Sequence, residues 1–194
     1  AGMRSAAPGD VAELAEAVRA SPRGLLVAGW GADLDPAAVD AFAAASGWPV
    51  LADPLSGARR GPAAISAYDG LVRAPRFAAA HRPSLVIRVG GAPTSKALTA
   101  WLDGPIPQVL VDPSGGWADP ARVASLRLTA DPTGLLAATA ALLTADGPRS
   151  EARPTVRGRP TPGAGVTPVD DPASPWLGEW LEAERLAREA IDGL

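Results

Sequence analysis

The sequence predicts an α/β fold, a doubly wound parallel sheet of five to six strands with helices on both faces, over residues 24–145. Three observations lead to this prediction. Short, wholly apolar runs recur along the region, which is typical of parallel strands that are buried on both faces. Segments with apolar residues at helical spacing separate these runs. Strands that alternate with helices form βαβ units, and their parallel strands share one sheet.

Each element follows from its local pattern. Residues 1–23 are expected to form an N-terminal segment with one helix, because Asp10 can cap a run of helically spaced apolar residues. Asp35-Pro36 marks the start of a second helix, since proline suits the first helical position. The expected strands lie at 25–28, 49–52, 85–89, 108–111 and, with a weaker pattern, 125–128. The remaining expected helices lie at 65–73, 94–102 and 132–143.

The composition changes after the sheet region. Residues 146–175 are dense in Pro and Gly and lack periodicity, so we expect a linker or extended arm there. Residues 176–194 predict an amphipathic helix with Trp176 and Trp180 on its apolar side. Either this helix docks on the domain's own sheet or, as we assign it, it starts a third domain. Five charged residues of the helix are expected to face solvent: Glu182, Glu184, Arg185, Arg188 and Glu189.

The composition excludes several kinds of site. The 194 residues contain no Cys and a single His, which excludes disulfides, a Cys nucleophile and metal sites built on thiolates or on several imidazoles. Eighteen basic residues against 21 acidic ones lack the basic excess of a nucleic-acid groove. No apolar run approaches the ~18–20 residues of a membrane helix, and the first residues lack a signal-peptide pattern. We therefore expect a cytoplasmic protein that binds no nucleic acid and has no membrane span.

The segment at 89–96, Val-Gly-Gly-Ala-Pro-Thr-Ser-Lys, is the most informative candidate site. A strand runs into glycines, and a helix then opens with Thr94, Ser95 and Lys96. Exposed N–H groups at a helix start and an ammonium group together favour a carboxylate or phosphate. Of the 18 basic residues 17 are arginine, so the one lysine stands out. The alternative is a capped helix with a solvated lysine, and the spacing does not fit a Walker A loop.

Two further functions stay open. Gly29-Trp30-Gly31 resembles the start of a dinucleotide fingerprint, but Leu34 occupies the place of its third glycine. A module that binds ADP, FAD or NAD is therefore the first alternative. The tryptophans of the last helix favour the second alternative, an interaction scaffold.

Catalytic motifs are missing from the sequence. The lone histidine, His81, lies in a turn without the context of a nucleophile elbow. No HExxH motif and no carboxylate-rich metal loop occur. We therefore predict no catalytic residue and no metal ligand in this chain.

Several motifs, taken in order, resemble one enzyme family. They are Gly-Trp-Pro-Val-Leu-Ala-Asp-Pro-Leu-Ser-Gly at 47–57, Tyr-Asp at 68–69, Leu-Val-Ile-Arg-Val-Gly at 85–90, Pro-Thr-Ser-Lys at 93–96 and Gln-Val-Leu-Val-Asp-Pro at 108–113. Together they are similar to the central domain of 2-succinyl-5-enolpyruvyl-6-hydroxy-3-cyclohexene-1-carboxylate synthase, the thiamine-diphosphate-dependent enzyme of menaquinone biosynthesis. The likeness covers about residues 10–145.

The resemblance implies a larger enzyme with flanking domains on both sides of this chain. Those first and third domains would hold thiamine diphosphate and Mg²⁺ between the subunits of a homo-oligomer, so no cofactor is expected in this chain. The whole enzyme decarboxylates 2-oxoglutarate and adds the succinyl unit to isochorismate. This chain by itself is not expected to catalyse the reaction.

The resemblance also implies roles for individual residues. Lys96 matches the family's basic residue that helps to hold a substrate carboxylate, with Thr94 and Ser95 directly before it. Ala97 stands where some members have an arginine, which removes a second carboxylate contact. In some members the central domain also binds a naphthoate product as a feedback inhibitor. The arginines in plausible places for such an effector are Arg59, Arg73 and Arg76.

Overall fold

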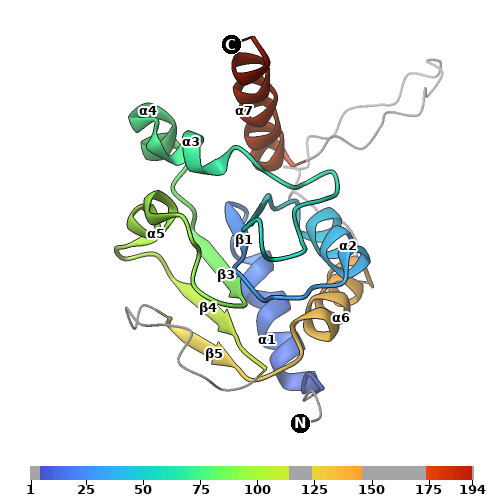
Figure 1. The fold of residues 1–194 in the computed structure, drawn as a ribbon. Helices are drawn as coiled ribbons and strands as arrows, with labels where there is room; N and C mark the ends of the chain where they lie inside the picture. Colours follow the sequence, from blue (N-terminus) through green and yellow to red (C-terminus); the bar gives the residue numbers. More distant parts are fainter. Residues whose placement is uncertain (1–4, 114–123, 146–173, 194) are drawn as a thin grey trace, which may run out of the picture.

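A five-stranded, all-parallel sheet forms the centre of the computed structural model, which describes residues 5–113, 124–145 and 174–193 (Figure 1). The strands lie side by side in the order β2-β1-β3-β4-β5. This is the flavodoxin-like order of a doubly wound sheet, and it confirms the predicted fold class. The strands are β1 (Gly24–Ala28), β2 (Val50–Ala52), β3 (Leu85–Val89), β4 (Gln108–Val111) and β5 (Leu126–Leu128).

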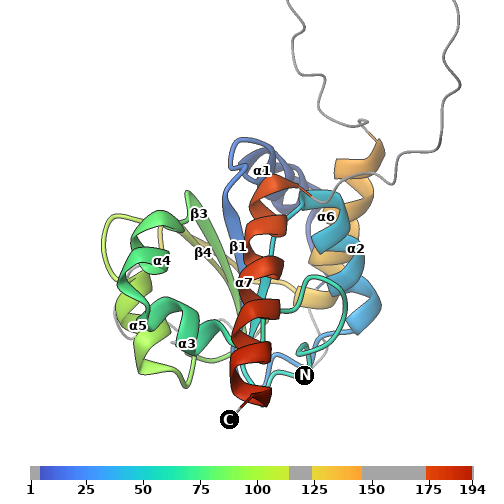
Figure 2. The same ribbon diagram turned by 90° about the horizontal axis from the view of Figure 1, so that it is seen from above.

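Helices cover both faces of the sheet (Figure 2). One face carries α1 (Pro8–Arg19), α2 (Pro36–Ser46) and α6 (Pro132–Ala145). The other face carries α3 (Tyr68–Arg73), α4 (Pro75–Ala80) and α5 (Lys96–Leu102). Helix α7 (Pro175–Asp192) packs Trp176 and Trp180 into the core of this second face and Leu177 into the core of the first. Along these described ranges no helix combines the length and apolar character that crossing a membrane requires.

The central strand β1 shows why its sequence is wholly apolar. Leu26 and Ala28 point into the core under α1, α2 and α6, whereas Leu25 and Val27 point into the core on the opposite face. All four side chains are at most 1% exposed. Burying a leucine or valine fully contributes about 1.5–3 kcal/mol. Residues of alternating direction therefore all need apolar side chains, as the sequence predicted.

Two helices begin later than predicted, and one helix was not predicted. The helix predicted at 94–102 begins at Lys96, because Ser95 has extended backbone angles and its hydroxyl caps the helix by accepting from the Leu98 N–H. The helix predicted at 65–73 begins only at Tyr68. Helix α4 was not predicted: Pro75 starts it after an extended Ala74. The linker predicted at 146–175 lies outside the described residues up to 173.

Helix α7 docks on the domain itself. Trp176 is 5% exposed and Trp180 is fully buried, and the Trp176 Nε1–H donates to the Gly24 carbonyl at 2.8 Å. The Trp180 ring meets Phe77 and Trp101 edge-on, at centroid distances of 4.9 and 6.0 Å. Of the two interpretations of this helix, docking on its own domain is therefore observed. Its assignment to a third domain stays a prediction.

One prediction about α7 was wrong. Glu184 was expected to face solvent but is 7% exposed. It lies one helical turn after Trp180, and so on the docked side of the helix. Its carboxylate accepts hydrogen bonds from the Ala67 N–H and the Arg188 Nε–H, both at 2.7 Å, and these bonds offset the cost of burying the charge.

Candidate functional site

The carboxyl ends of β1 and β3 mark the place where ligands bind in doubly wound sheets, because the chain leaves these two neighbouring strands toward opposite faces. Here the loops after the two strands touch. The Gly29 N–H donates to the Val89 carbonyl at 2.8 Å, and the Gly91 N–H donates to the Trp30 carbonyl at 2.9 Å. A Cβ on Gly29 would lie 1.7 Å from the Gly91 carbonyl oxygen, so only glycine permits this approach.

The dinucleotide-like segment has a structural role in this contact. The Trp30 indole lies over Gly91, where a Cβ would come within 2.3 Å of the indole Nε1, and the Trp30 residue stays 56% exposed. Helix α2 starts only at Pro36, several residues after the glycines. The helix N-terminus that would hold a pyrophosphate therefore does not directly follow the glycine turn.

A buried carboxylate at the end of β2 ties this edge together. Asp53 is 2% exposed. Its Oδ1 accepts from the Leu55 N–H at 3.0 Å, while its Oδ2 accepts from the Thr94 N–H at 2.9 Å and from the Thr94 hydroxyl at 2.6 Å. Asp53 thus joins the loop after β2 to the segment that leads into α5.

These contacts set the charge state of Asp53. Burial by itself would raise the pKa of this carboxyl, but the Thr94 hydroxyl, the Leu55 and Thr94 N–H groups and the Arg59 guanidinium together hold its pKa below the ordinary value. Asp53 is therefore a carboxylate at neutral pH, and its oxygens can act only as acceptors.

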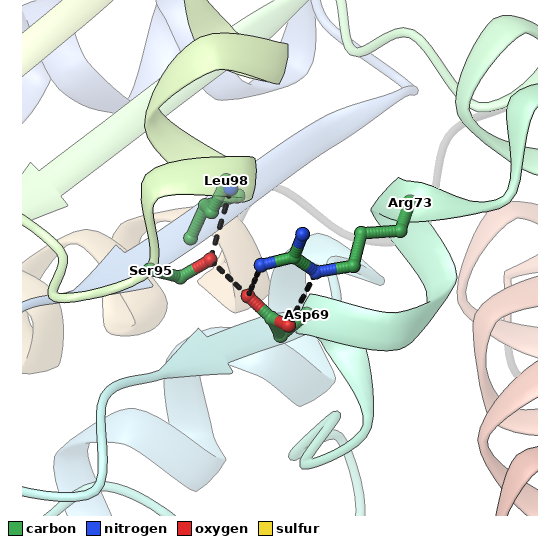
Figure 3. Close-up of polar contacts among 4 residues, drawn as sticks. All are labelled: Asp69, Arg73, Ser95 and Leu98. Carbon is green, nitrogen blue, oxygen red and sulfur yellow. Dashed lines mark hydrogen bonds and ion pairs between the residues drawn. The ribbon is translucent and has the colours of Figure 1, made fainter.

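A second carboxylate, Asp69 in α3, holds the next residue of the segment (Figure 3). The Ser95 hydroxyl donates to the Asp69 Oδ1 at 2.5 Å and accepts from the Leu98 N–H at 3.0 Å. Arg73, one turn along α3, donates to the Asp69 Oδ2 at 2.8 Å. The bonds from Arg73 and Ser95 lower the pKa of Asp69. Asp53 and Asp69 thus brace two consecutive residues, Thr94 and Ser95.

Lys96 follows these two braced residues directly. It is the first residue of α5, and its side chain is exposed. No carboxylate of the residues that the structure describes lies within ion-pair distance of its ammonium group. The predicted trio therefore divides: Thr94 and Ser95 bind carboxylates of the chain itself, and Lys96 presents a free charge. The roles of Thr94 and Ser95 as substrate contacts stay predictions.

The three arginines predicted as an effector site are all exposed. Arg59 donates to the Ser66 carbonyl at 2.6 Å, just before α3, and Arg73 pairs with Asp69 within α3. Arg76 lies in α4. In the described part of the chain the three share no partner, and the effector site stays a prediction.

Sequence reasoning missed the parts played by Asp53 and Asp69. Both stand in the motifs that carry the resemblance, but neither was predicted to bind Thr94 or Ser95. The partner of Asp53 lies 41 residues away, at Thr94. No local pattern reports a contact of that separation, so only the fold reveals the pairing.

A metal site requires several converging donors. Among residues 5–113, 124–145 and 174–193 no group of three or more His, Asp or Glu side chains could hold a metal ion. The resemblance places Mg²⁺ in the flanking domains, and no chemical step in this chain is assigned to it.

The fold and this edge together define a Rossmann-like α/β domain. Residues 11–147 match the family model described as "Middle domain of thiamine pyrophosphate". Because the match covers well over half of the chain, the chain belongs to this family of middle domains.

Curated relatives narrow the likeness further, to proteins named 2-succinyl-5-enolpyruvyl-6-hydroxy-3-cyclohexene-1-carboxylate synthase. The one from Haloquadratum walsbyi is 45% identical over 122 residues, which are 59% of this chain and 20% of that protein. The one from Halobacterium salinarum is 42% identical over 148 residues, which are 72% of this chain and 24% of that protein. The one from Bacillus velezensis is 34% identical over 144 residues, 71% of this chain and 25% of that protein. The chain therefore spans a quarter or less of the length of these relatives.

Proposed function

We propose that this chain is the central domain of a synthase that joins a succinyl unit from 2-oxoglutarate to isochorismate, and that Lys96 binds a carboxylate of one of these two substrates. The first half of the proposal is supported by the family match and by the names of the relatives. The second half is supported by one observation, the exposed ammonium group of Lys96 on a segment that two carboxylates brace.

The charges around this segment make Lys96 the fitting contact. Asp69 already neutralises Arg73 at 2.8 Å, and Arg59 already donates to the Ser66 carbonyl. An incoming carboxylate would compete with Asp69 for Arg73. Lys96 has no such competitor in the described part of the chain, so its binding to a substrate costs no existing ion pair.

The remaining parts of the proposal rest on the resemblance. Thiamine diphosphate and Mg²⁺ would be held by the flanking domains of the whole synthase, which would be a cytoplasmic homo-oligomer. Thiamine diphosphate supplies the carbanion chemistry when it is bound there. This chain would contribute the scaffold, the contact from Lys96 and, through Arg59, Arg73 and Arg76, an effector site for a naphthoate product. The comparisons give no support to the nucleotide-binding alternative.

The test is a kinetic comparison in the whole synthase that contains this chain. Parent protein and Lys96→Ala are assayed with 2-oxoglutarate and isochorismate, each varied at saturation of the other. A hydrogen bond to a charged group is worth about 1.5–3 kcal/mol, so kcat/KM for one substrate should fall roughly 10- to 150-fold. Equal kinetics of the two proteins would remove Lys96 from the site, and a parent without synthase activity would refute the whole proposal.

A further inference from the structure

We propose that Asp53 is a positioning residue for Lys96: from the end of β2 its carboxylate fixes Thr94, two residues before Lys96, and thereby fixes where the ammonium group stands. This inference rests on the proposed function of Lys96. Asp53 itself touches no substrate in this account.

Asp53 is suited to this part because it is itself immobile. Its own N–H donates to the Ala28 carbonyl at 2.8 Å, which continues the pairing of β2 with β1. Its Oδ1 is held by the Leu55 N–H. With 2% exposure the carboxylate has no room to choose another rotamer. The position of Oδ2 is therefore set by the sheet.

Thr94 receives its position from that oxygen. One residue gives Oδ2 two donors, its N–H at 2.9 Å and its hydroxyl at 2.6 Å, so both its backbone and its side chain are fixed. Hydrogen bonds to an ionised acceptor are about twice as strong as neutral ones. Between Val89 and Lys96 the loop is held at Gly91, whose N–H donates to the Trp30 carbonyl, and then at Thr94 and Ser95 by the two carboxylates.

The acceptor of the second brace, the Asp69 carboxylate that binds Ser95, is more exposed than the Asp53 carboxylate. The Asp69 side chain is 48% exposed and divides its oxygens between Ser95 and Arg73. Water competes for such an acceptor, which weakens its hold on the chain. Asp53 is therefore the brace on which the geometry of Lys96 depends most.

The substitution Asp53→Asn distinguishes a positioning role of Asp53 from an effect of its negative charge alone. If the amide oxygen keeps the bond from Leu55, the amide nitrogen faces the Thr94 N–H, and two donors then oppose each other. The loop should move away. Electrostatics alone predicts the opposite sign, because removing a negative charge near Lys96 would strengthen the binding of an anion. Asp33→Asn is the matched control, since it removes an exposed negative charge from the same edge without touching Thr94.

The test is a double-mutant cycle in the whole synthase, with Asp53→Asn, Lys96→Ala and the double variant. Asp53→Asn should lower kcat/KM about tenfold, and less than about twofold in the Lys96→Ala background, because the two changes remove the same contact. Asp33→Asn should leave kcat/KM within about twofold or raise it. Thr94→Val should resemble Asp53→Asn, whereas Thr94→Ser, which keeps both donors, should restore kcat/KM.

A second readout needs no activity. In the present chain the backbone amide of Lys96 should have an order parameter of about 0.85, and it should fall toward 0.6 in Asp53→Asn and Thr94→Val. Additive losses in the cycle, or an unchanged order parameter in both variants, would overturn the positioning role. The cycle also distinguishes the two proposals. If Lys96→Ala has no effect on kcat/KM, the proposed contact between Lys96 and a substrate carboxylate is refuted. If Lys96→Ala has an effect but the losses are additive, only the positioning role of Asp53 is refuted.

Discussion

Two regions of this domain each rest on a buried carboxylate that accepts main-chain hydrogen bonds, and they differ in everything around it. At the sheet edge, Asp53 binds Leu55 and Thr94, and its neighbours are short loops. Within the 18-residue helix α7, the Glu184 carboxylate accepts from the Ala67 N–H, and the same helix carries Trp180, which packs in a cluster of aromatic rings. Similar hydrogen bonds from the main chain to a buried carboxylate can therefore serve stability in one region and the position of a side chain in another.

The difference lies in what else holds each region. Helix α7 buries Trp176 and Trp180 and would stay docked with weakened polar contacts. The segment from Gly90 to Lys96 buries no large side chain, so its shape depends on polar contacts: the bonds to Asp53 and Asp69 and the bond from the Gly91 N–H to the Trp30 carbonyl. Changes at the helix should therefore act mainly on the free energy of unfolding. Changes at the sheet edge should act mainly on the geometry of Lys96.

The largest expected effect on stability comes from removing an aromatic side chain with which α7 docks. Trp180→Ala removes a fully buried ring and should lower the free energy of unfolding by about 3–5 kcal/mol. Urea unfolding followed by circular dichroism measures this change. Leu186→Ala on the same helix is the control, because Leu186 is 51% exposed and should change stability by less than about 0.5 kcal/mol. Similar losses for both variants would mean that α7 is not docked through Trp180.

A smaller effect is expected from the polar anchor of α7. Glu184→Ala leaves the Ala67 N–H without its acceptor and should cost about 1–3 kcal/mol. Glu184→Gln keeps an acceptor oxygen and should cost less. Thermal denaturation of both variants measures the difference. A glutamine variant as unstable as the alanine variant would show that the charge, not the hydrogen bond to Ala67, anchors the helix.

Substitution of Thr94 at the sheet edge should lower the free energy of unfolding less than either change in α7. Thr94→Val removes the hydroxyl that donates to Asp53 and should cost about 1 kcal/mol in urea unfolding. The same change should lower kcat/KM of the whole synthase much more than this loss of stability accounts for. If stability falls by 3 kcal/mol or more, the segment before Lys96 is a structural element rather than a positioning one.

The smallest effect is a dependence of stability on acid. The pKa values of Asp53 and Asp69 are lower in the folded chain than their ordinary values, so on acidification the unfolded chain takes up protons first. Their contribution is complete above the unfolded pKa of about 4 and is lost as the pH falls further. Unfolding experiments between pH 6 and 3 should show a shallower loss for Asp53→Asn than for the parent. Equal slopes would contradict the lowered pKa of Asp53.

The order of strands and helices in this domain could be predicted from the sequence for a physical reason. Strands buried on both faces need apolar runs. Such runs stood at β1 and β2, and at β3 and β4 with one polar residue each, Arg88 and Gln108. Lys96 was also found from the sequence, because it is the single lysine among 17 arginines and stands after a glycine pair.

The rest depended on contacts between distant residues. Glu184 was predicted to be exposed because it carries a charge. It is buried because the N–H of Ala67, 117 residues away, donates a hydrogen bond to its carboxylate. The bond from Thr94 to Asp53 likewise spans 41 residues. Helix α4 has only six residues, three of them alanine, so it has no apolar periodicity by which to predict it.

The most direct test of the central claim is an experimental structure of the whole synthase with 2-oxoglutarate or isochorismate bound. We expect the Lys96 Nζ to lie about 2.7–3.2 Å from a substrate carboxylate oxygen, with the Thr94 hydroxyl still donating to Asp53. A substrate whose carboxylates are all held by other residues, with Lys96 facing solvent, would contradict it.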